Sequence, residues 1–364
     1  MIKTIDECFF QIQNGANIKQ GDVDGGFPIT RIETTANDKF NRDRMGYAGI
    51  TDISKYESYV LEDGDLLMSH INSVQYLGRT VLYVKEADET IIHGMNLLRL
   101  KARRDVINPA YARYCFYGHS FRSKVGNITK KSVNQASFAV KDLKQIKIEV
   151  PSLSEQDQIV KVLDKLQNLI KMRNDELSAL DDLIKARFIE MFGNPVSNSY
   201  GLPEATLPDL GKFGRGVSKH RPRNDIKLLG GKYPLIQTGD VANAGLYITS
   251  YCNTYSELGL KQSKMWDKGT LCITIAANIA KTAILEFDAC FPDSVVGFTA
   301  NERTNNVFIH YWFSFFQAIL ESQAPESAQK NINLKILSEL KVIVPEKRKQ
   351  DEFAAFVAQV DKSK

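Results

Sequence analysis

The sequence predicts an α+β protein made of two similar globular domains, each followed by an apolar-periodic helix. Three observations lead to this prediction. A segment occurs twice, about 194 residues apart, both halves contain short apolar pieces broken by turns, and a long helical pattern lies between them. A chain of 364 residues suits two domains of ordinary size, each large enough for its own core.

The repeat is clearest where each domain ends. Residues 132–151 and residues 327–345 share a polar beginning, an apolar strand-like ending and a final proline. After each proline, a polar run contains a matching glutamine, Gln156 or Gln350, and then leads into a helix. Because a duplicated unit presents two similar surfaces on one chain, it favours recognition of a two-part target over a single catalytic pocket.

The first half reads as short strands followed by helix. Strands are expected at 59–61, 65–69, 80–84, 91–93 and 146–150, and a helix at 109–125. The second half repeats this order, since residues 267–271 correspond to 62–66 and residues 281–284 to 79–82. The scaffold is therefore duplicated, whereas the loops have diverged.

The strongest helix is predicted from Ser154, as N-cap with Asp157 at the third helical position, to residue 192, where Gly193 and Pro195 end it. At 1.5 Å per residue it is roughly 55–60 Å long. Its apolar residues follow the alternating three- and four-residue spacing of a coiled-coil seam, at Ile159, Leu163, Leu166, Ile170, Leu177, Leu180, Ile184 and Met191.

Such a seam needs a partner to cover it, and the repeat supplies one. The second helix, from residue 345, carries apolar residues at Phe353, Phe356, Val357 and Val360. It reaches only Lys364, about half the length of the first helix. A paired arrangement of the two helices is expected, and a plain spacer helix between ordinary domains is the alternative.

Motifs for catalysis are missing from the sequence. There is no phosphate-binding Gly-rich loop, no nucleophile elbow and no aminomethyltransferase signature. The five histidines are scattered and the five cysteines form no Cys-x-x-Cys pair, so neither a metal site nor a disulfide framework is expected. Asp288 and Asp293 flank a thiol, but no Glu-x-Lys follows at nuclease spacing, so a turn between buried aromatics is expected. The chain reads as non-catalytic and without a cofactor.

Composition indicates a cytoplasmic protein with reduced thiols. The longest apolar stretch, residues 271–280, is too short to cross a bilayer, and the first residues lack the apolar core of a secretion signal. The net charge of +4 is mild, so a basic surface for nucleic acid must be local.

Candidate DNA-binding residues occur in both halves. The segment 212–223 combines Gly and Pro with Arg215, Lys219, Arg221 and Arg223, whose side chains can contact phosphates or guanine edges. In the first half, hydrogen-bonding residues and basic runs occur near turns, at Ser69, His70, Asn72, Arg99, Lys101 and Arg103, and again within 122–131. The segment 275–278, with Asn278, is the counterpart of 70–72. The alternative for each is an ordinary solvated loop or turn.

Residues 148–165 together with 184–195 resemble the central conserved region of specificity (S) subunits of type I restriction–modification systems. Two further sets of segments look like the target-recognition domains of that family, namely 28–32 with 65–73, and 233–240 with 269–280 and 290–297. The resemblance covers nearly the whole chain.

The resemblance implies a division into a first target-recognition domain (1–150), a central conserved helix (151–195), a second target-recognition domain (196–344) and a shortened second helix (345–364). In this family each domain reads one half of a split double-stranded DNA sequence. The two helices pack antiparallel, set the spacer length and bind two adenine-methylating modification subunits. The assembly also recruits motor-nuclease restriction subunits.

The short second helix departs from the family pattern and leaves two consequences open. One is weaker docking of a modification subunit, and the other is self-association that borrows helix from another copy. The leading hypothesis is thus a non-catalytic subunit that reads DNA for a methyltransferase and restriction complex. The alternative is a structural adaptor that joins two protein ligands without binding DNA.

Overall fold

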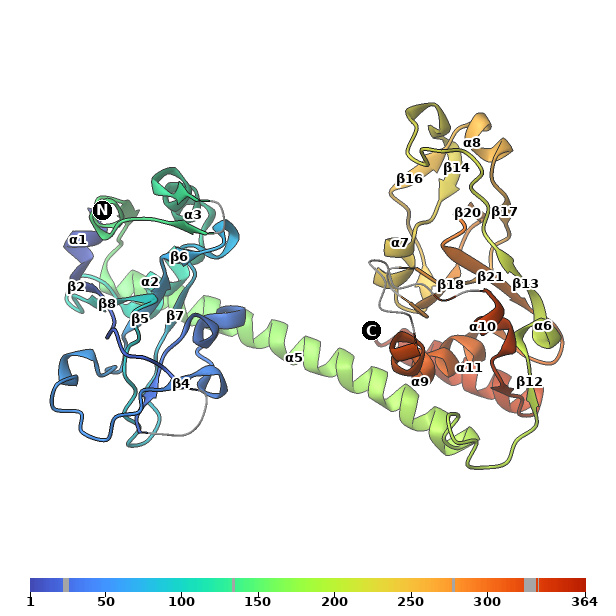
Figure 1. Cartoon of the computed structure of the whole chain (residues 1–364), viewed down its shortest axis with the longest axis horizontal. Coiled ribbons are helices and arrows are strands. Elements are labelled where there is room, and N and C mark those ends of the chain that lie inside the picture. Colours follow the sequence, from blue (N-terminus) through green and yellow to red (C-terminus); the bar gives the residue numbers. More distant parts are fainter. Residues whose placement is uncertain (22–25, 133–134, 277–278, 324–331, 333) are drawn as a thin grey trace. The chain divides into compact units, whose positions relative to one another are not determined.

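The computed structural model describes residues 1–21, 26–132, 135–276, 279–323, 332 and 334–364 (Figure 1). Residues 327–331 and 333 of the second repeat copy, and Asn278, therefore lie outside the described residues. Contacts divide the chain into two compact units, unit 1 (Met1–Met172) and unit 2 (Arg173–Lys364). Among the helices so described, none has the length and apolar character needed to cross a membrane.

Unit 1 is built on a four-stranded antiparallel sheet in the order β2-β8-β5-β7. These strands are β2 (Phe9–Asn14), β8 (Leu97–Ala102), β5 (Leu66–Ser69) and β7 (Thr80–Leu82). The main core of the unit packs sheet residues such as Leu66, Leu98 and Leu100 against Phe116 and Phe121 of the helices. A second cluster, including Leu67, Val81 and Leu97, covers the opposite face, so the central strands are buried on both sides.

The remaining elements of unit 1 surround this sheet. Its helices are α1 (Ile5–Cys8), α2 (Pro109–Tyr117), α3 (His119–Ile128) and α4 (Val140–Lys144), with 3-10 turns η1 (Ile32–Asp38), η2 (Arg42–Arg44), η3 (Glu57–Tyr59) and η4 (Val74–Tyr76). The small sheets are β1 (Ile2–Thr4) with β11 (Lys147–Glu149), β3 (Pro28–Ile29) with β4 (Gly46–Tyr47), and β6 (Ile71–Asn72), β10 (Ala136–Ser137) and β9 (Lys130–Lys131) in that order.

Unit 2 repeats the four-stranded order as β13-β21-β18-β19 and adds β15 at the edge. These strands are β13 (Gly211–Arg215), β21 (Val295–Ala300), β18 (Leu271–Thr274), β19 (Thr282–Leu285) and β15 (Tyr247–Ile248). A second sheet has the order β16-β14-β20-β17, with β16 (Asn253–Tyr255), β14 (Leu229–Leu235), β20 (Ala289–Cys290) and β17 (Met265–Trp266). The equal strand order of β2-β8-β5-β7 and β13-β21-β18-β19 confirms the predicted α+β fold with two similar domains.

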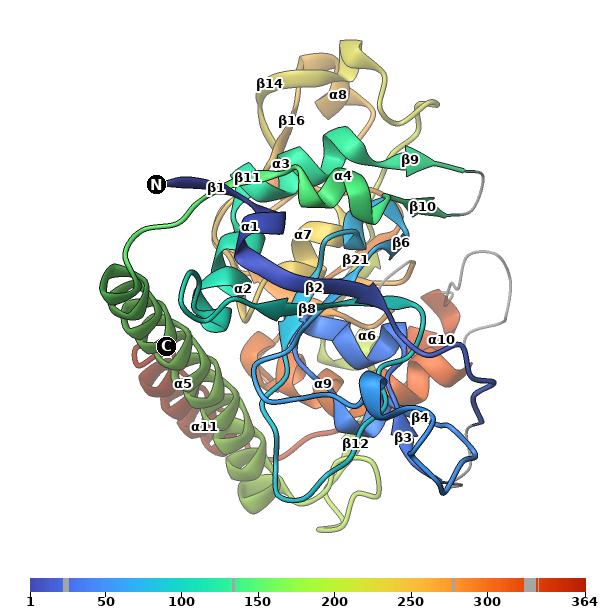
Figure 2. The same cartoon turned by 90° about the vertical axis from the view of Figure 1, so that its left-hand side faces the viewer.

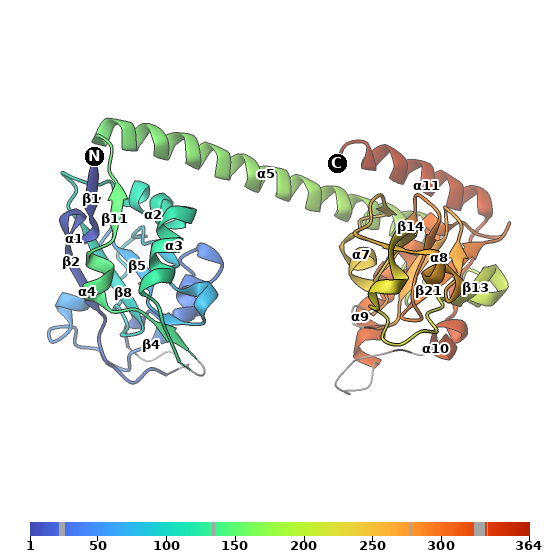
Figure 3. The ribbon, with the colours of Figure 1, turned by 90° about the horizontal axis from the view of Figure 1, so that it is seen from above.

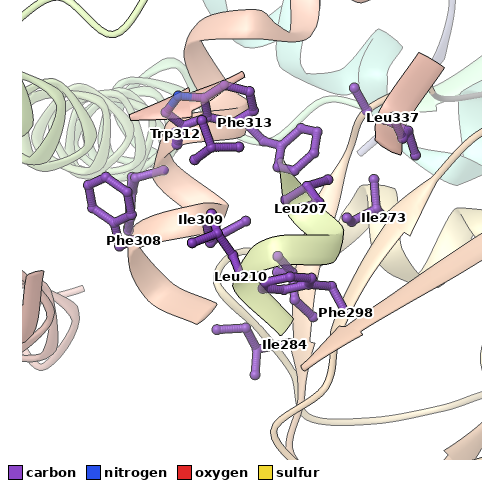
Figure 4. Packing of buried hydrophobic residues seen from close by; sticks show 14 of the residues in the cluster. Leu207, Leu210, Ile273, Ile284, Phe298, Phe308, Ile309, Trp312, Phe313 and Leu337 are labelled. Atoms are coloured by element: carbon purple, nitrogen blue, oxygen red, sulfur yellow. The ribbon is translucent and has the colours of Figure 1, made fainter. Parts of the chain in front are cut away.

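The remaining elements of unit 2 cover this framework. They are β12 (Glu204–Ala205) paired with β22 (Val342–Ile343), α6 (Leu207–Leu210), η5 (Ile226–Leu228), α7 (Thr238–Asn243), α8 (Glu257–Lys261), α9 (Asn306–Gln323), α10 (Leu334–Glu339) and α11 (Lys347–Asp361). Figure 4 shows the core that results, in which Phe308, Ile309 and Trp312 of α9 lie beside residues of the sheet and of α6.

Two matched glutamines hold the starts of α5 (Leu153–Phe192) and α11 against their domains. The fully buried Gln156 side chain donates to the carbonyls of Val106 and Pro151 and accepts from the backbone N–H of Asn108. The fully buried Gln350 repeats the pattern.

The Gln350 amide donates to the carbonyls of Arg303 and Pro345, and its oxygen accepts from the Thr304 hydroxyl. An aspartate one position later, Asp157 or Asp351, accepts from an asparagine of the domain in both units. The duplication seen in the sequence thus extends to individual hydrogen bonds.

The long helix is α5 (Leu153–Phe192), as predicted, but its cap is different. Ser152, rather than Ser154, occupies the N-cap and exchanges hydrogen bonds with Glu155. Asp157 is engaged by the Asn108 amide instead, because it faces the domain.

Within unit 2, α11 lies antiparallel alongside the second half of α5 (Figures 2 and 3). Phe353 near the start of α11 contacts Phe188 and Phe192, with ring centroids 5.3 and 5.8 Å apart. At the other end, the Lys364 ammonium lies 2.7 Å from the Asp181 carboxylate. The predicted pairing of the two helices is therefore present along residues 173–192 of α5.

Several short elements differ from the sequence-based predictions. Residues 59–61 and 91–93 meet through an isolated bridge between Val60 and Ile92 rather than as strands. The predicted helix 109–125 is two helices, because Gly118 has extended backbone angles at their junction. Strand β8 lies between β2 and β5, but the sequence predicts only a basic run there. Arg99 and Lys101 interrupt the apolar pattern expected of a strand whose residues are all buried.

Candidate nucleic-acid interface

The basic segment 212–223 of unit 2 begins on β13 (Gly211–Arg215) and continues from Gly216 as a loop held close to the domain. The Gly216 N–H donates to the Val295 carbonyl at 2.8 Å, and the Val217 N–H donates to the Phe291 carbonyl at 3.1 Å. A Cβ at Gly216 would lie 2.3 Å from the Phe291 oxygen, so only glycine allows this approach. The start of the loop is therefore fixed, and both Arg215, at the end of β13, and Lys219, in the loop, are exposed to solvent.

The next two arginines of the loop share one carboxylate. Arg221 and Arg223 both form ion pairs with Asp293, and their side chains remain 55% and 45% exposed. The Arg221 guanidinium also donates to the carbonyls of Ser218 and His220. Both guanidinium groups are thus accessible to solvent, and the ion pairs with Asp293 fix their orientation.

A pocket of about 290 Å³ lies next to Arg223. Polar side chains line much of it, contributed by the loop, the start of α7, the start of β16 and the turn after β20. Its lining is Arg223, Asn224, Leu229, Leu235, Gln237, Thr238, Asn253, Tyr255, Pro292 and Ser294. Amides and an arginine gathered in this way match the hydrogen-bonding edges of purines.

Asn224, Gln237 and Asn253 were missed by the sequence analysis. They lie far apart in the chain, and each reads singly as a turn or strand-end residue. Only the pairing of β14 with β16, and of β14 with β20, brings them around one pocket. Of the three, only Gln237 lies in a segment, residues 233–240, that resembles a recognition domain.

In unit 1, two of the predicted DNA-binding cations are buried, which corrects their assignment. Arg99 is 1% exposed and donates to the carbonyls of Ser58 and Val60, and Lys101 is 9% exposed and pairs with Glu62 at 2.5 Å. Both lie on β8, which has a strand on each side, and by strand alternation they share the face of Leu97, which the cluster of Leu67 and Val81 covers. Their charges are used inside the domain, so they cannot contact a phosphate in this structure.

Ser69 and His70 are also buried, with 0% and 5% exposure; Ser69 is the last residue of β5, and the His70 ring lies against Phe138 with ring centroids 6.3 Å apart. Burial lowers the pKa of His70 to about 4. A neutral, covered imidazole of this kind is a packing residue in this structure. Arg103 is exposed and Asn72 half-buried, so these two stay available.

The small sheet β6-β10-β9 brings Asn72 together with a basic run of the sequence. Asn72 and Lys131 both pair with Ala136 of the central strand, and Ile71 and Lys130 both pair with Ser137. Lys130 and Lys131 are exposed. An amide and two lysines therefore share one sheet on the surface of unit 1, although about 60 residues separate them in the chain. The counterpart segment in unit 2 includes Asn278, which lies outside the described residues.

The two acidic residues considered for a nuclease site have separate structural partners. Asp288 accepts a hydrogen bond from the Lys268 backbone N–H at 2.8 Å, whereas Asp293 pairs with the loop arginines. Phe291, which lies between them in the chain, is fully buried and stacks on Trp266 with ring centroids 5.0 Å apart. This segment is a turn next to buried aromatics.

A second candidate surface is the apolar seam of α5. Its second half is covered, since Ile184 is buried, Leu177 and Leu180 are half-buried, and Phe353 and Val360 are buried. Phe356 is half-buried. The first half is open instead, as three of the predicted seam residues are largely exposed, namely Ile159 (37%), Leu166 (49%) and Ile170 (61%); Leu163 is half-buried. The seam thus continues past the helix that covers it.

A family model described as type I restriction modification DNA specificity domain matches residues 3–180 and 204–364. The chain belongs to this family. Each matched range contains one copy of the duplicated sheet and the helix start that carries one of the matched glutamines, so the two family matches coincide with the two copies of the repeat.

Two relatives carry related names. The chain is 27% identical over 371 residues to the putative type I restriction enzyme MjaX specificity subunit of Methanocaldococcus jannaschii, covering 99% of this chain and 86% of that protein. It is 24% identical over 205 residues to the type I restriction enzyme EcoKI specificity subunit of Escherichia coli K12, covering 55% of this chain and 43% of that protein.

Solved structures show the same fold. The crystal structure of a type I restriction–modification S subunit from M. genitalium matches with a TM-score of 0.57 at 15% identity, covering 100% of this chain and 89% of that chain. A chain from a structural study of complex assembly and conformational transition of the type I system matches with a TM-score of 0.55 at 14% identity, covering 100% and 90%.

Proposed function

We propose that this type I specificity subunit reads a bipartite double-stranded DNA target, one half-site with each unit. One observation carries the proposal: the same sheet order and the same glutamine contacts occur in both units, but the exposed side chains on them differ. A shared scaffold with different hydrogen-bonding surfaces suits two readers of different sequence.

The exposed chemistry of each unit supports this reading. In unit 2, Arg215, Lys219, Arg221 and Arg223 are exposed, and Arg223 forms part of a pocket lined by amides. In unit 1, Asn72 lies on the sheet that carries Lys130 and Lys131, and Arg103 is exposed. Cations position a protein on the phosphate backbone, and amide or guanidinium groups distinguish base edges.

We further propose that the helices dock adenine methyltransferase (modification) subunits, which supply the chemistry, and that the assembly then joins motor-nuclease (restriction) subunits. The open half of the α5 seam supports this role. Val162, Leu169 and Met172 lie near the exposed seam residues and are 58%, 57% and 66% exposed, so the helix presents a continuous apolar surface. Surfaces of this kind mark protein-binding sites.

Adenine methylation of a genome tests the proposal. The chain is expressed with its cognate modification subunit in cells without other methylation systems, and modified adenines are mapped by sequencing. A split motif that appears only when both proteins are present is the expected result, and it gives both half-sites and the spacer. The modification subunit alone is the control. No new motif, despite co-purification of the two proteins, would favour the adaptor that binds no DNA.

A further inference from the structure

We infer that Asp293 is a positioning residue that holds Arg223 at the mouth of the amide-lined pocket, and that this pocket reads a base edge in the half-site of unit 2. The inference rests on the proposed function and extends it by naming the residues that set sequence specificity. Asp293 is a carboxylate on a surface that would approach DNA. A negative charge there is unfavourable for binding a polyanion unless it has another role.

Asp293 joins the loop to the pocket wall. Its two oxygens accept from different arginines, one from Arg221 and one from Arg223, and its side chain is 34% exposed. Pro292 and Ser294, its chain neighbours, both line the pocket, as does Arg223 itself. A charge-assisted contact of this kind fixes the direction of a guanidinium group, which otherwise has many rotamers.

The support beneath Asp293 is rigid. Phe291, two residues before Asp293, is fully buried and stacked on Trp266, and the Val295 N–H donates to the Pro292 carbonyl at 3.0 Å to close a turn. Val295 then begins β21, which lies between two strands of the sheet. The core of unit 2 therefore fixes the position of the Asp293 carboxylate, and the ion pair with this carboxylate fixes the position of the Arg223 guanidinium.

The pocket offers hydrogen-bonding groups that have no other use in the fold. Across the part of the chain that the structure describes, the side-chain amides of Asn224 and Asn253 form no hydrogen bond, and Gln237 lies at the N-cap of α7. Asn and Gln pair with the edge of adenine, and Arg pairs with the edge of guanine, each through two hydrogen bonds. The combination of a fixed arginine and unengaged amides is suited to a purine edge in the major groove.

The effect of removing the Asp293 charge distinguishes a positioning role from a purely electrostatic effect on DNA binding. A carboxylate near the DNA backbone repels phosphates, so removing it should favour non-specific binding. If Asp293 positions Arg223, its removal should at the same time weaken binding to the correct sequence. Opposite changes on target and scrambled DNA are therefore the signature of positioning.

The experiment uses the chain assembled with its modification subunit and labelled duplexes based on the motif found by methylation mapping. Asp293→Asn is compared with Asp288→Asn, which makes the same change of charge five residues away and leaves the arginines untouched. Asp293→Glu restores the carboxylate. Affinities are measured by fluorescence anisotropy on the intact target, on targets altered in either half-site, and on a scrambled duplex.

For Asp293→Asn we expect about tenfold weaker binding to the intact target, the range of one lost base contact. Binding to the scrambled duplex should be equal or tighter, and discrimination should fall for one half-site only, with partial recovery in Asp293→Glu. Equal factors on target and scrambled DNA, matching those of Asp288→Asn, would overturn the inference. Absence of target preference in the unaltered complex would instead overturn the proposed function.

Discussion

Replacing the two buried glutamines by leucine tests whether each helix start is tied to its own unit. Gln350→Leu keeps the approximate volume of the side chain but removes three hydrogen bonds, two donated to the carbonyls of Arg303 and Pro345 and one accepted from Thr304. Gln156→Leu removes the corresponding three in unit 1. The two substitutions are therefore matched in chemistry and differ in location.

The expected magnitude follows from burial. Both glutamines are 0% exposed, and Thr304, the partner of Gln350, is 2% exposed, so water cannot replace the lost bonds. A buried polar group left without a partner costs about 1–3 kcal/mol, which gives roughly 3 kcal/mol for the set after allowance for the apolar gain of leucine. With a slope of about 2–3 kcal/mol per molar urea, the unfolding midpoint should fall by roughly 1 M.

The assay can separate the two units, because both tryptophans of the chain, Trp266 and Trp312, lie in unit 2. Intrinsic tryptophan fluorescence therefore reports the unfolding of unit 2, whereas far-ultraviolet circular dichroism reports both units. Gln350→Leu should shift the fluorescence transition. Gln156→Leu should shift only the dichroism transition of unit 1.

Two results would refute this reasoning. A fluorescence midpoint shift below about 0.3 M for Gln350→Leu would mean that the hydrogen bonds add little to stability. An equal fluorescence shift for Gln156→Leu would mean that the units do not unfold separately. The controls are Gln158→Leu and Gln359→Leu, which change exposed glutamines on the same helices.

Three further predictions concern the DNA surface, the helix seam and pH. Arg215→Ala should weaken DNA binding by the assembled complex and reduce the slope of log affinity against log salt by about 1, measured by anisotropy across a salt series. Leu166→Asp should preserve folding but reduce co-purification of the modification subunit, whereas Leu180→Asp should destabilise unit 2 by roughly 2–3 kcal/mol, because it places a carboxylate against the packed helices. Burial lowers the pKa of His70 to about 4 and that of His93 to about 3, so below pH 6.5 the unfolded chain binds more protons than the folded chain. Unit 1 should therefore lose stability as the pH falls from 6.5 to 4. The loss should be less steep in His70→Gln.

Matched variants accompany these tests. Arg348→Ala removes an exposed arginine on α11 and should leave DNA affinity unchanged; an equal loss in both variants would contradict the role of the loop. Asn168→Asp adds a carboxylate on the opposite side of α5 from Leu166, so equal loss of the modification subunit would argue against the seam. His119 is exposed, and a His119→Gln variant with the same flattened pH profile would show that burial is not the cause.

The sequence alone predicted the duplicated α+β plan, the long central helix and a pairing of the two helices. These features follow from local sequence patterns that can be recognised without knowing any tertiary contact. The patterns are apolar residues at helical spacing, a glutamine after each proline, and matching strand-like endings. A hydrophobic stripe repeats along one element, so its period can be read from the chain itself.

The tertiary structure decided which polar residues face solvent. Arg99 and Lys101 read as a basic surface run, yet they lie inside because β8 is flanked by strands on both sides and covered on both faces. Conversely, Asn253 and Asp293 read as ordinary turn residues, and only strand pairing places Asn253 in the wall of the pocket and Asp293 beside Arg223. The exposure of a side chain depends on neighbours contributed by distant parts of the chain, and local spacing carries no record of those neighbours.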